Sequence, residues 1–282
     1  EGKALAEALK GNSIMKDLNL AGNRMGMKSS ADWEGADMSG VIAISNAIPT
    51  MGAMTSLDIS ANNLGQLVAP AKLPDGWKKT DYANEDYRYE HSDGRHQREP
   101  PGGKPEGAIA LANAIPTMGA LVKLTMGNNR LQGTEVGKAL GDAIAVNTVL
   151  KELDLSGKGS GYDYRQGCDV EFVKEFAVGL GANGAMVSVD MRNNRLGKEG
   201  GEALLDALKG HPSITTFCTI PIQALKDNSI TELDLSNKGL GVGEAIILSY
   251  YIRNSRAMTS LDISNSSIGQ LMPSEDWETD DN

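Results

Sequence analysis

The chain has 282 residues, with 27 Lys and Arg against 37 Asp and Glu, which gives a formal net charge of −10. This acidic balance argues against nucleic acid and against anionic membrane surfaces as partners, because like charges repel. Hydrophobic residues make up 40% of the chain, enough for a packed core. No apolar run approaches the roughly 20 residues that span a bilayer.

The chain has only two cysteines, Cys168 and Cys218. They provide no disulfide framework for a chain of this length, which favours a reducing compartment. We therefore expect an intracellular, cytoplasmic protein, with a chloroplast protein peripheral to a membrane complex as the alternative. The sequence opens at Glu1 without a signal peptide, so we expect a processed or trimmed product.

Internal repeats dominate the sequence, since segment 43–60 returns in similar form at 110–127. Both segments contain the pattern Leu-x-x-Leu-x-Leu-x-x-Asn-x-Leu, which occurs in eight copies. We call its second leucine position the anchor. The anchors are, in order, Leu18, Leu57, Leu124, Leu153, Val189, Phe217, Leu233 and Leu261.

The spacing of the anchors indicates what each repeat contains. The commonest step is 28 or 29 residues, which leaves room for a strand, a loop and a helix. Apolar residues at i, i+3 and i+4 predict helices over 4–9, 41–48, 136–144, 172–180, 203–208 and 246–250. Strands that alternate with helices run parallel and are covered by the helices on one side.

In this pattern the chain resembles the ribonuclease-inhibitor-like leucine-rich repeat family, over 1–65 and 106–282. The resemblance implies an α/β solenoid, a horseshoe with a parallel sheet on its concave face and helices on its convex face. The segment 112–121 is also similar to repeat arrays of photosynthetic protists, which bears on source and not on mechanism.

Two features depart from the regular repeat. The asparagine of the pattern is replaced in four copies, by Lys158, Ile222, Lys238 and Ser266, so we expect an interrupted hydrogen-bond ladder. The step from Phe217 to the next anchor is only 16 residues, which we interpret as leaving no room for a helix. We expect a kink or an irregular seam there.

The longest step contains an insert, so we divide the chain into 1–65, 66–105 and 106–282. The insert has seven basic and seven acidic residues, so the repeats carry the whole acidic excess. Its order of aromatic residues resembles a WW module, which clamps proline-rich peptides. The corresponding residues are Trp77, Tyr87, Tyr89, His91 and Arg98, the last in place of the second tryptophan. A hairpin that packs on the edge of the horseshoe is the alternative. Residues 269–277 repeat the start of this insert, as if a second one were cut short.

The residue after each anchor points out of the sheet, because side chains alternate along a strand. Five of these positions are aspartate, namely Asp58, Asp154, Asp190, Asp234 and Asp262. Glu152 and Glu232 lie two residues earlier on the same face, and Cys218 takes the position in the degenerate copy. We interpret this row as an acidic stripe for a basic partner. Solvated carboxylates and a bound hard cation are the alternatives.

No arrangement of residues predicts catalysis, a cofactor or a metal site. We therefore expect a non-enzymatic scaffold or adaptor with a basic or proline-rich protein partner, without nucleic acid or membrane insertion. The alternative is a structural, peripheral subunit of a large photosynthetic or cytoskeletal assembly. A third possibility comes from the resemblance alone, because the same repeat family includes activators of a small GTPase.

Overall fold

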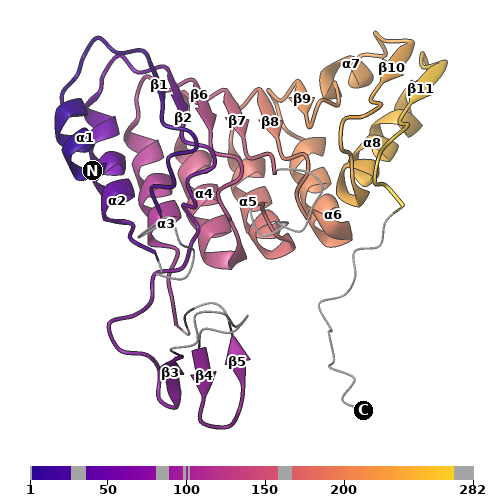
Figure 1. Cartoon of the computed structure of the whole chain (residues 1–282). Coiled ribbons are helices and arrows are strands. Elements are labelled where there is room, and N and C mark those ends of the chain that lie inside the picture. Colours follow the sequence, from indigo (N-terminus) through magenta and orange to yellow (C-terminus); the bar gives the residue numbers. More distant parts are fainter. Residues whose placement is uncertain are drawn as a thin grey trace.

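A computed structural model describes residues 2–26, 36–80, 89–97, 100, 102–157 and 167–269. The repeats form two layers, with short strands along one side and helices along the other (Figure 1). The strands of the repeats are β1 (Asp17–Asn19), β2 (Ser56–Asp58), β6 (Lys123–Thr125), β7 (Glu152–Asp154), β8 (Ser188–Asp190), β9 (Thr216–Phe217), β10 (Glu232–Asp234) and β11 (Ser260–Asp262). The α-helices are α1 (Gly2–Leu9), α2 (Ser39–Ala47), α3 (Glu106–Ala114), α4 (Gly133–Val146), α5 (Val170–Ala182), α6 (Gly197–Lys209), α7 (Ile222–Lys226) and α8 (Val242–Asn254). Two short 3-10 helices, η2 (Ile48–Thr50) and η3 (Ile115–Thr117), continue α2 and α3.

The strands pair in the register that the anchors predict. In the six-stranded parallel sheet β1-β2-β6-β7-β8-β9, each anchor lies opposite the next one. In the two-stranded parallel sheet, Leu233 of β10 lies opposite Leu261 of β11. The predicted alignment of the eight repeats is therefore confirmed at every strand pair within the two sheets.

The row of strands is broken between β9 and β10, where the sequence predicts a seam. Phe217 and Ile220 pair with each other across a tight turn, in which Cys218 and Thr219 have φ of 48° and 68°. Because β9 turns back on itself, it offers no edge to the following strand. The prediction that this step has no room for a helix is wrong. The tight turn uses so few residues that the five-residue helix α7 fits behind it.

The core lies between the two layers. Phe172 and Phe176 of α5 are fully buried there and stack with ring centroids 5.8 Å apart. Helices α4 and α5 approach each other closely, because a Cβ atom on Gly179 would lie 2.1 Å from the carbonyl oxygen of Gly141. Only glycine allows this distance between the two helices.

A ladder of asparagine side chains joins the loops that follow the strands. Asn129 accepts the backbone N–H of Asn62 (2.7 Å) and donates to the carbonyl oxygens of Ile59 and Met126 (both 2.9 Å). Each asparagine thereby satisfies backbone groups of its own repeat and of the preceding one, which buried loops require. In this way the sequence pattern holds neighbouring repeats together.

Cys168 takes a ladder position in the fourth repeat. Its backbone N–H donates to Asn194 Oδ1 (2.7 Å), and its Sγ lies 4.0 Å from the carbonyl oxygen of Leu155. Lys158 lies outside the described residues.

A second ladder lies at the ends of the helices, and the sequence analysis did not predict it. Asn183 Oδ1 accepts the backbone N–H groups of Ala185 and Met186, and its Nδ2 donates to the carbonyl oxygen of Asn147 (2.9 Å). His211 takes the same place one repeat later, where its Nδ1 accepts from Ser213 and Ile214. The imidazole therefore substitutes for an asparagine amide.

The insert contains a three-stranded antiparallel sheet of β3 (Trp77–Lys79), β4 (Tyr89–His91) and β5 (His96–Gln97), in the order β3-β4-β5. It is thus more than the single hairpin of the alternative prediction. In Figure 1 this sheet projects from the solenoid near α3. At its base Val68 and Lys104 form an antiparallel bridge that brings the two connecting segments together.

Candidate functional site on the strand face

The predicted acidic residues lie on the strands as expected. Asp58, Asp154 and Asp190 end β2, β7 and β8, while Asp234 and Asp262 end β10 and β11. Asp154 lies opposite Asp190 in the register, and Asp234 lies opposite Asp262. Neighbouring strands are about 4.8 Å apart, so both pairs bring like charges together.

Each of these aspartates also has a local structural role. Its Oδ1 accepts the backbone N–H two residues later, from Ser156 for Asp154 (2.8 Å) and from Ser236 for Asp234 (2.8 Å). The remaining members of the row, Asp58, Asp190 and Asp262, make the same turn. Side chains of this kind end strands by mimicking a backbone turn. Local folding therefore explains some of the recurrence of aspartate.

Basic residues interrupt the acidic row within the six-stranded sheet, which contains Asp58, Asp154 and Asp190. Arg192 donates from Nε and Nη2 to the Asp190 carboxylate, with Nη2 2.7 Å from Oδ2. The hydrogen bond to Asp190 raises the pKa of Arg192, and the charge of Asp154 adds to this. Arg192 thus relieves the repulsion between Asp154 and Asp190.

Lys123 compensates another carboxylate of this face, nearer the start of the strands. Its Nζ lies 3.4 Å from Glu152 Oε2 on the neighbouring strand. Neither basic residue was among the predicted site residues, although the sequence contains a signal for each. The register of β6 and β7 places Lys123 opposite Glu152. Arg192 lies two residues after Asp190, at the position that is serine after the other four aspartates of the row.

The acidic residues of the two-stranded sheet, on β10 and β11, keep their negative charge. Within the described portion of the chain, Glu232, Asp234 and Asp262 form no ion pair with a lysine or arginine. Hydrogen bonds from Ser236 lower the pKa of Asp234, and Lys238 adds a smaller effect, so this carboxyl stays ionised at neutral pH. The strand face therefore carries its strongest unpaired negative charge beyond the seam.

Cys218 is not on this face, which corrects the prediction. It is fully buried, because the tight turn after β9 directs its side chain inward, and its Sγ accepts the backbone N–H of Met191 at 3.2 Å. Burial raises the pKa of the Cys218 thiol, and likewise that of Cys168. Both thiols are therefore inert at neutral pH.

The aromatic residues of the insert are only partly described. Trp77 packs against His91 with ring centroids 5.0 Å apart, and the Arg95 guanidinium lies 5.7 Å from the Trp77 ring. Tyr89 is buried within the small sheet. Tyr87 lies outside the described residues, and so does Arg98, which stands in place of the second tryptophan and leaves the predicted clamp without one wall.

The described residues contain neither a metal cluster nor a membrane-spanning helix. No group of three or more His, Cys, Asp and Glu side chains in the described ranges could hold a metal ion. Among the helices of these ranges, none combines the length and the apolar character needed to cross a membrane.

Comparisons with known proteins find the repeat in one segment of the chain. A leucine-rich repeat family model matches residues 186–205, which contain β8 and the first turns of α6. Among solved structures, the C-terminal domain of tropomodulin from Caenorhabditis elegans is similar, with 11% identity and a TM-score of 0.41, over 74% of this chain and 92% of that chain. No curated protein matches. The matched segment and the in-register repeats support a protein of leucine-rich repeat type, a class whose extended surfaces generally bind other proteins.

Proposed function

We propose that the protein is a non-enzymatic scaffold or adaptor whose strand face, the concave side of a horseshoe, binds a basic protein partner. The observation that carries this proposal is the pair Asp234 and Asp262, in register and without an ion pair to a lysine or arginine among the described residues. Two like charges at this spacing repel each other, and a partner's lysine or arginine between them relieves the repulsion.

Charge neutralisation can test this proposal without damage to the fold. The variant D234N/D262N removes both charges, but each asparagine Oδ1 still accepts the backbone N–H that ends the strand. We expect its affinity for an oligolysine peptide to fall by about tenfold, which corresponds to about 1.4 kcal/mol. The affinity of the unmodified chain should also fall with salt, because screening weakens exposed charges.

Two controls sharpen this test. D154N/D190N removes the same charge from a pair that Arg192 already compensates, so its effect should be clearly smaller. E135Q/E202Q removes two charges from α4 and α6 on the helix layer and should leave the affinity unchanged. Equal losses in all three variants would show that only net charge matters and would refute a site on β10 and β11.

For the insert, 66–105, we propose a separate module that binds proline-rich peptides. Its support is the three-stranded antiparallel sheet together with the packing of Trp77 on His91. A proline-rich peptide should change the tryptophan fluorescence of the full chain in a saturable way, and Y87A should abolish the change. A peptide that binds Y87A as well as the unmodified chain would contradict this role.

A structural subunit of a larger assembly is the second candidate function. It is favoured by apolar side chains on the helix layer, where Val146 is 67% exposed and Val178 is 74% exposed. Cross-linking in native-source lysate, fractionated by size at low and high salt, separates the candidates. Persistence in a large complex at both salts, with cross-links to α4 and α5, would favour the subunit. Salt-sensitive cross-links to β10 and β11 would favour the adaptor.

A further inference from the structure

A cavity lies at the seam, between the ends of α6, α7 and α8. It has a volume of about 300 Å³ and is lined by Lys209, Leu225, Lys226, Tyr250, Tyr251 and Asn254. Lys209 ends α6 and Lys226 ends α7, whereas the two tyrosines and Asn254 come from α8. At this place α7 has only five residues, whereas α6 and α8 have thirteen each.

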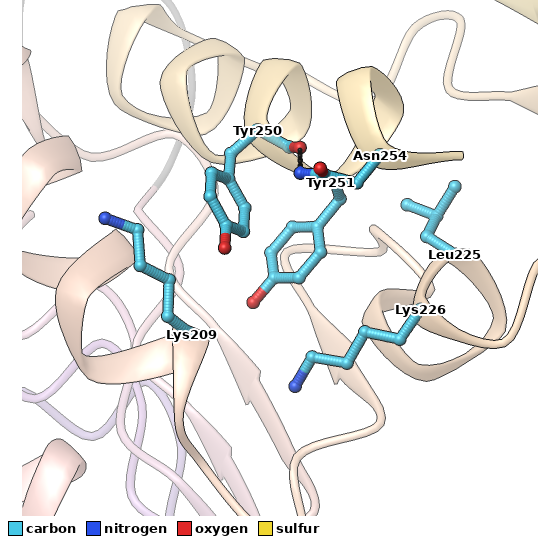
Figure 2. Close-up of a pocket in the computed structure, with 6 residues that line it drawn as sticks. All are labelled: Lys209, Leu225, Lys226, Tyr250, Tyr251 and Asn254. Atoms are coloured by element: carbon cyan, nitrogen blue, oxygen red, sulfur yellow. Dashed lines mark hydrogen bonds between the residues drawn. The ribbon is translucent and has the colours of Figure 1, made fainter. Parts of the chain in front are cut away.

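The lining is basic and aromatic, unlike the acidic chain as a whole. In Figure 2 the two phenol rings hang from α8 between Lys209 on one side and Lys226 on the other. Lys209 Nζ lies 5.2 Å from the centroid of the Tyr250 ring, and Lys226 Nζ lies 5.8 Å from that of Tyr251. Among the residues that the structure describes, no carboxylate lines the cavity.

The two lysines differ in whether a carboxylate already pairs with their positive charge. Lys209 Nζ pairs with Asp206 at 2.8 Å, and it also faces the negative end of α6. Lys226 forms no ion pair within the described residues, and α7 has only five residues, so its dipole is small. The cavity therefore offers one uncommitted positive charge.

Tyr251 supplies a hydrogen-bond donor that the described chain does not use. Its side chain is only 3% exposed, and its hydroxyl has no hydrogen-bond partner among the described residues. Burial, with a smaller effect of Tyr250, raises the pKa of Tyr251 to about 12, so the hydroxyl stays protonated. A buried polar group without a partner is unfavourable, and an acceptor atom of a ligand would remove this cost.

We propose that this cavity binds a small organic carboxylate, with its carboxylate on Lys226 Nζ and the Tyr251 hydroxyl and its carbon skeleton against Leu225 and the two tyrosine rings. The single uncommitted charge matches a singly charged oxyanion better than a dianion. The apolar wall favours a ligand with an aromatic or aliphatic body. The Lys226 ammonium group lies 5.8 Å from the centroid of the Tyr251 ring, so both proposed polar contacts belong to the same part of the cavity.

The site is independent of the proposed strand-face function, because it uses none of the same residues. Remote carboxylates of the chain weaken an anion's binding only slightly, since the Debye length is about 8 Å at physiological salt. The charges that line the cavity therefore determine whether it binds an anion.

Titration of the full chain with benzoate, followed by two-dimensional NMR, tests the proposal. We expect saturable shifts at α7 and the end of α8 with a dissociation constant of about 1 mM. K226Q and Y251F should each weaken binding about tenfold. K138Q, which removes a lysine from the exposed face of α4, should not change it.

Three outcomes would overturn the proposal. Benzamide, the neutral analogue, should not bind, and equal binding of benzamide would remove the role of Lys226. Tighter binding of phenyl phosphate would refute the singly charged class. The absence of saturable shifts with benzoate would leave the lysines as mere packing partners of the tyrosine rings. Y251F remains informative about folding, because loss of an unpartnered hydroxyl should leave its melting temperature unchanged or raise it.

Discussion

Glu244 is a buried carboxylic acid next to the seam, and its titration should govern the pH dependence of stability. It is the third residue of α8, and its Oε2 accepts the backbone N–H of Gly241 at 3.0 Å, while Oε1 has no hydrogen-bond partner among the described residues. Burial raises the pKa of Glu244 from 4.5 to about 7. Asp190 adds to this increase, whereas the two backbone hydrogen bonds and Arg192 oppose it.

The magnitude follows from the linkage between proton binding and folding. A pKa raised by about 2.5 units corresponds to about 3 kcal/mol, at 1.36 kcal/mol for each unit. Because the folded state holds this proton more tightly than the unfolded state, the contribution is fully present below pH 4.5. It is lost progressively as the pH rises and is gone above about pH 7.

The variant E244Q should remove this dependence, because glutamine resembles the protonated acid and keeps the hydrogen bond to Gly241. Urea unfolding followed by circular dichroism, at several pH values between 4.5 and 8, measures the free energy of unfolding. We expect E244Q to be more stable than the unmodified chain at pH 8, by up to about 3 kcal/mol. The difference should nearly vanish at pH 4.5.

Glu199 provides a matched control, since it is the third residue of α6 but is exposed to solvent. E199Q should follow the unmodified chain at every pH. If the stability curves of E244Q and the unmodified chain ran parallel between pH 5 and 8, burial would not control this carboxyl, and the reasoning would be refuted.

Three further predictions concern packing, the ladder and the thiols. G179A should destabilise the protein by about 1–3 kcal/mol in urea unfolding, because its Cβ would clash with the Gly141 carbonyl; G181A in the same helix meets only an ordinary contact with Ala207 and should be neutral or stabilising. N129A should lower the free energy of unfolding by about 2–4 kcal/mol, because it leaves buried backbone groups of two repeats unpaired. N23A, at the exposed end of the ladder, should lower it clearly less. Equal losses of stability in the two variants would contradict the ladder's role. Cys168 and Cys218 should react with a thiol reagent only at the rate of unfolding at neutral pH, and fast reaction of the native chain would contradict their burial.

Much of the architecture could be predicted from the sequence because the repeat is short and each copy reinforces the others. The anchors, from Leu18 to Leu261, pair in the predicted register within each sheet, and the six predicted helical segments coincide with α1, α2, α4, α5, α6 and α8. A buried leucine at a fixed spacing is a local requirement of this packing, and local requirements can be read from residue order. The short step after Phe217 likewise predicted the seam.

The candidate site depended on contacts that the repeat pattern does not contain. The stripe of aspartates was visible in the sequence, but Arg192 neutralises one of its pairs, and the tight turn at Cys218 removes one position from the face. The place of Cys168 in the ladder depends on its contact with Asn194 of the next repeat. Such effects are set by loop geometry, which repeat spacing alone does not determine.

By itself, then, the sequence determined the repeating unit, its parallel strands and the place of the seam, because these follow from periodic burial along the chain. Only the tertiary structure decided what the seam creates. It buries Glu244 and Cys218, and it leaves a cavity between three helix ends in which Tyr251 lacks a partner among the described residues. These features arise where the period fails, because residues from separate repeats then meet in contacts that no single repeat encodes.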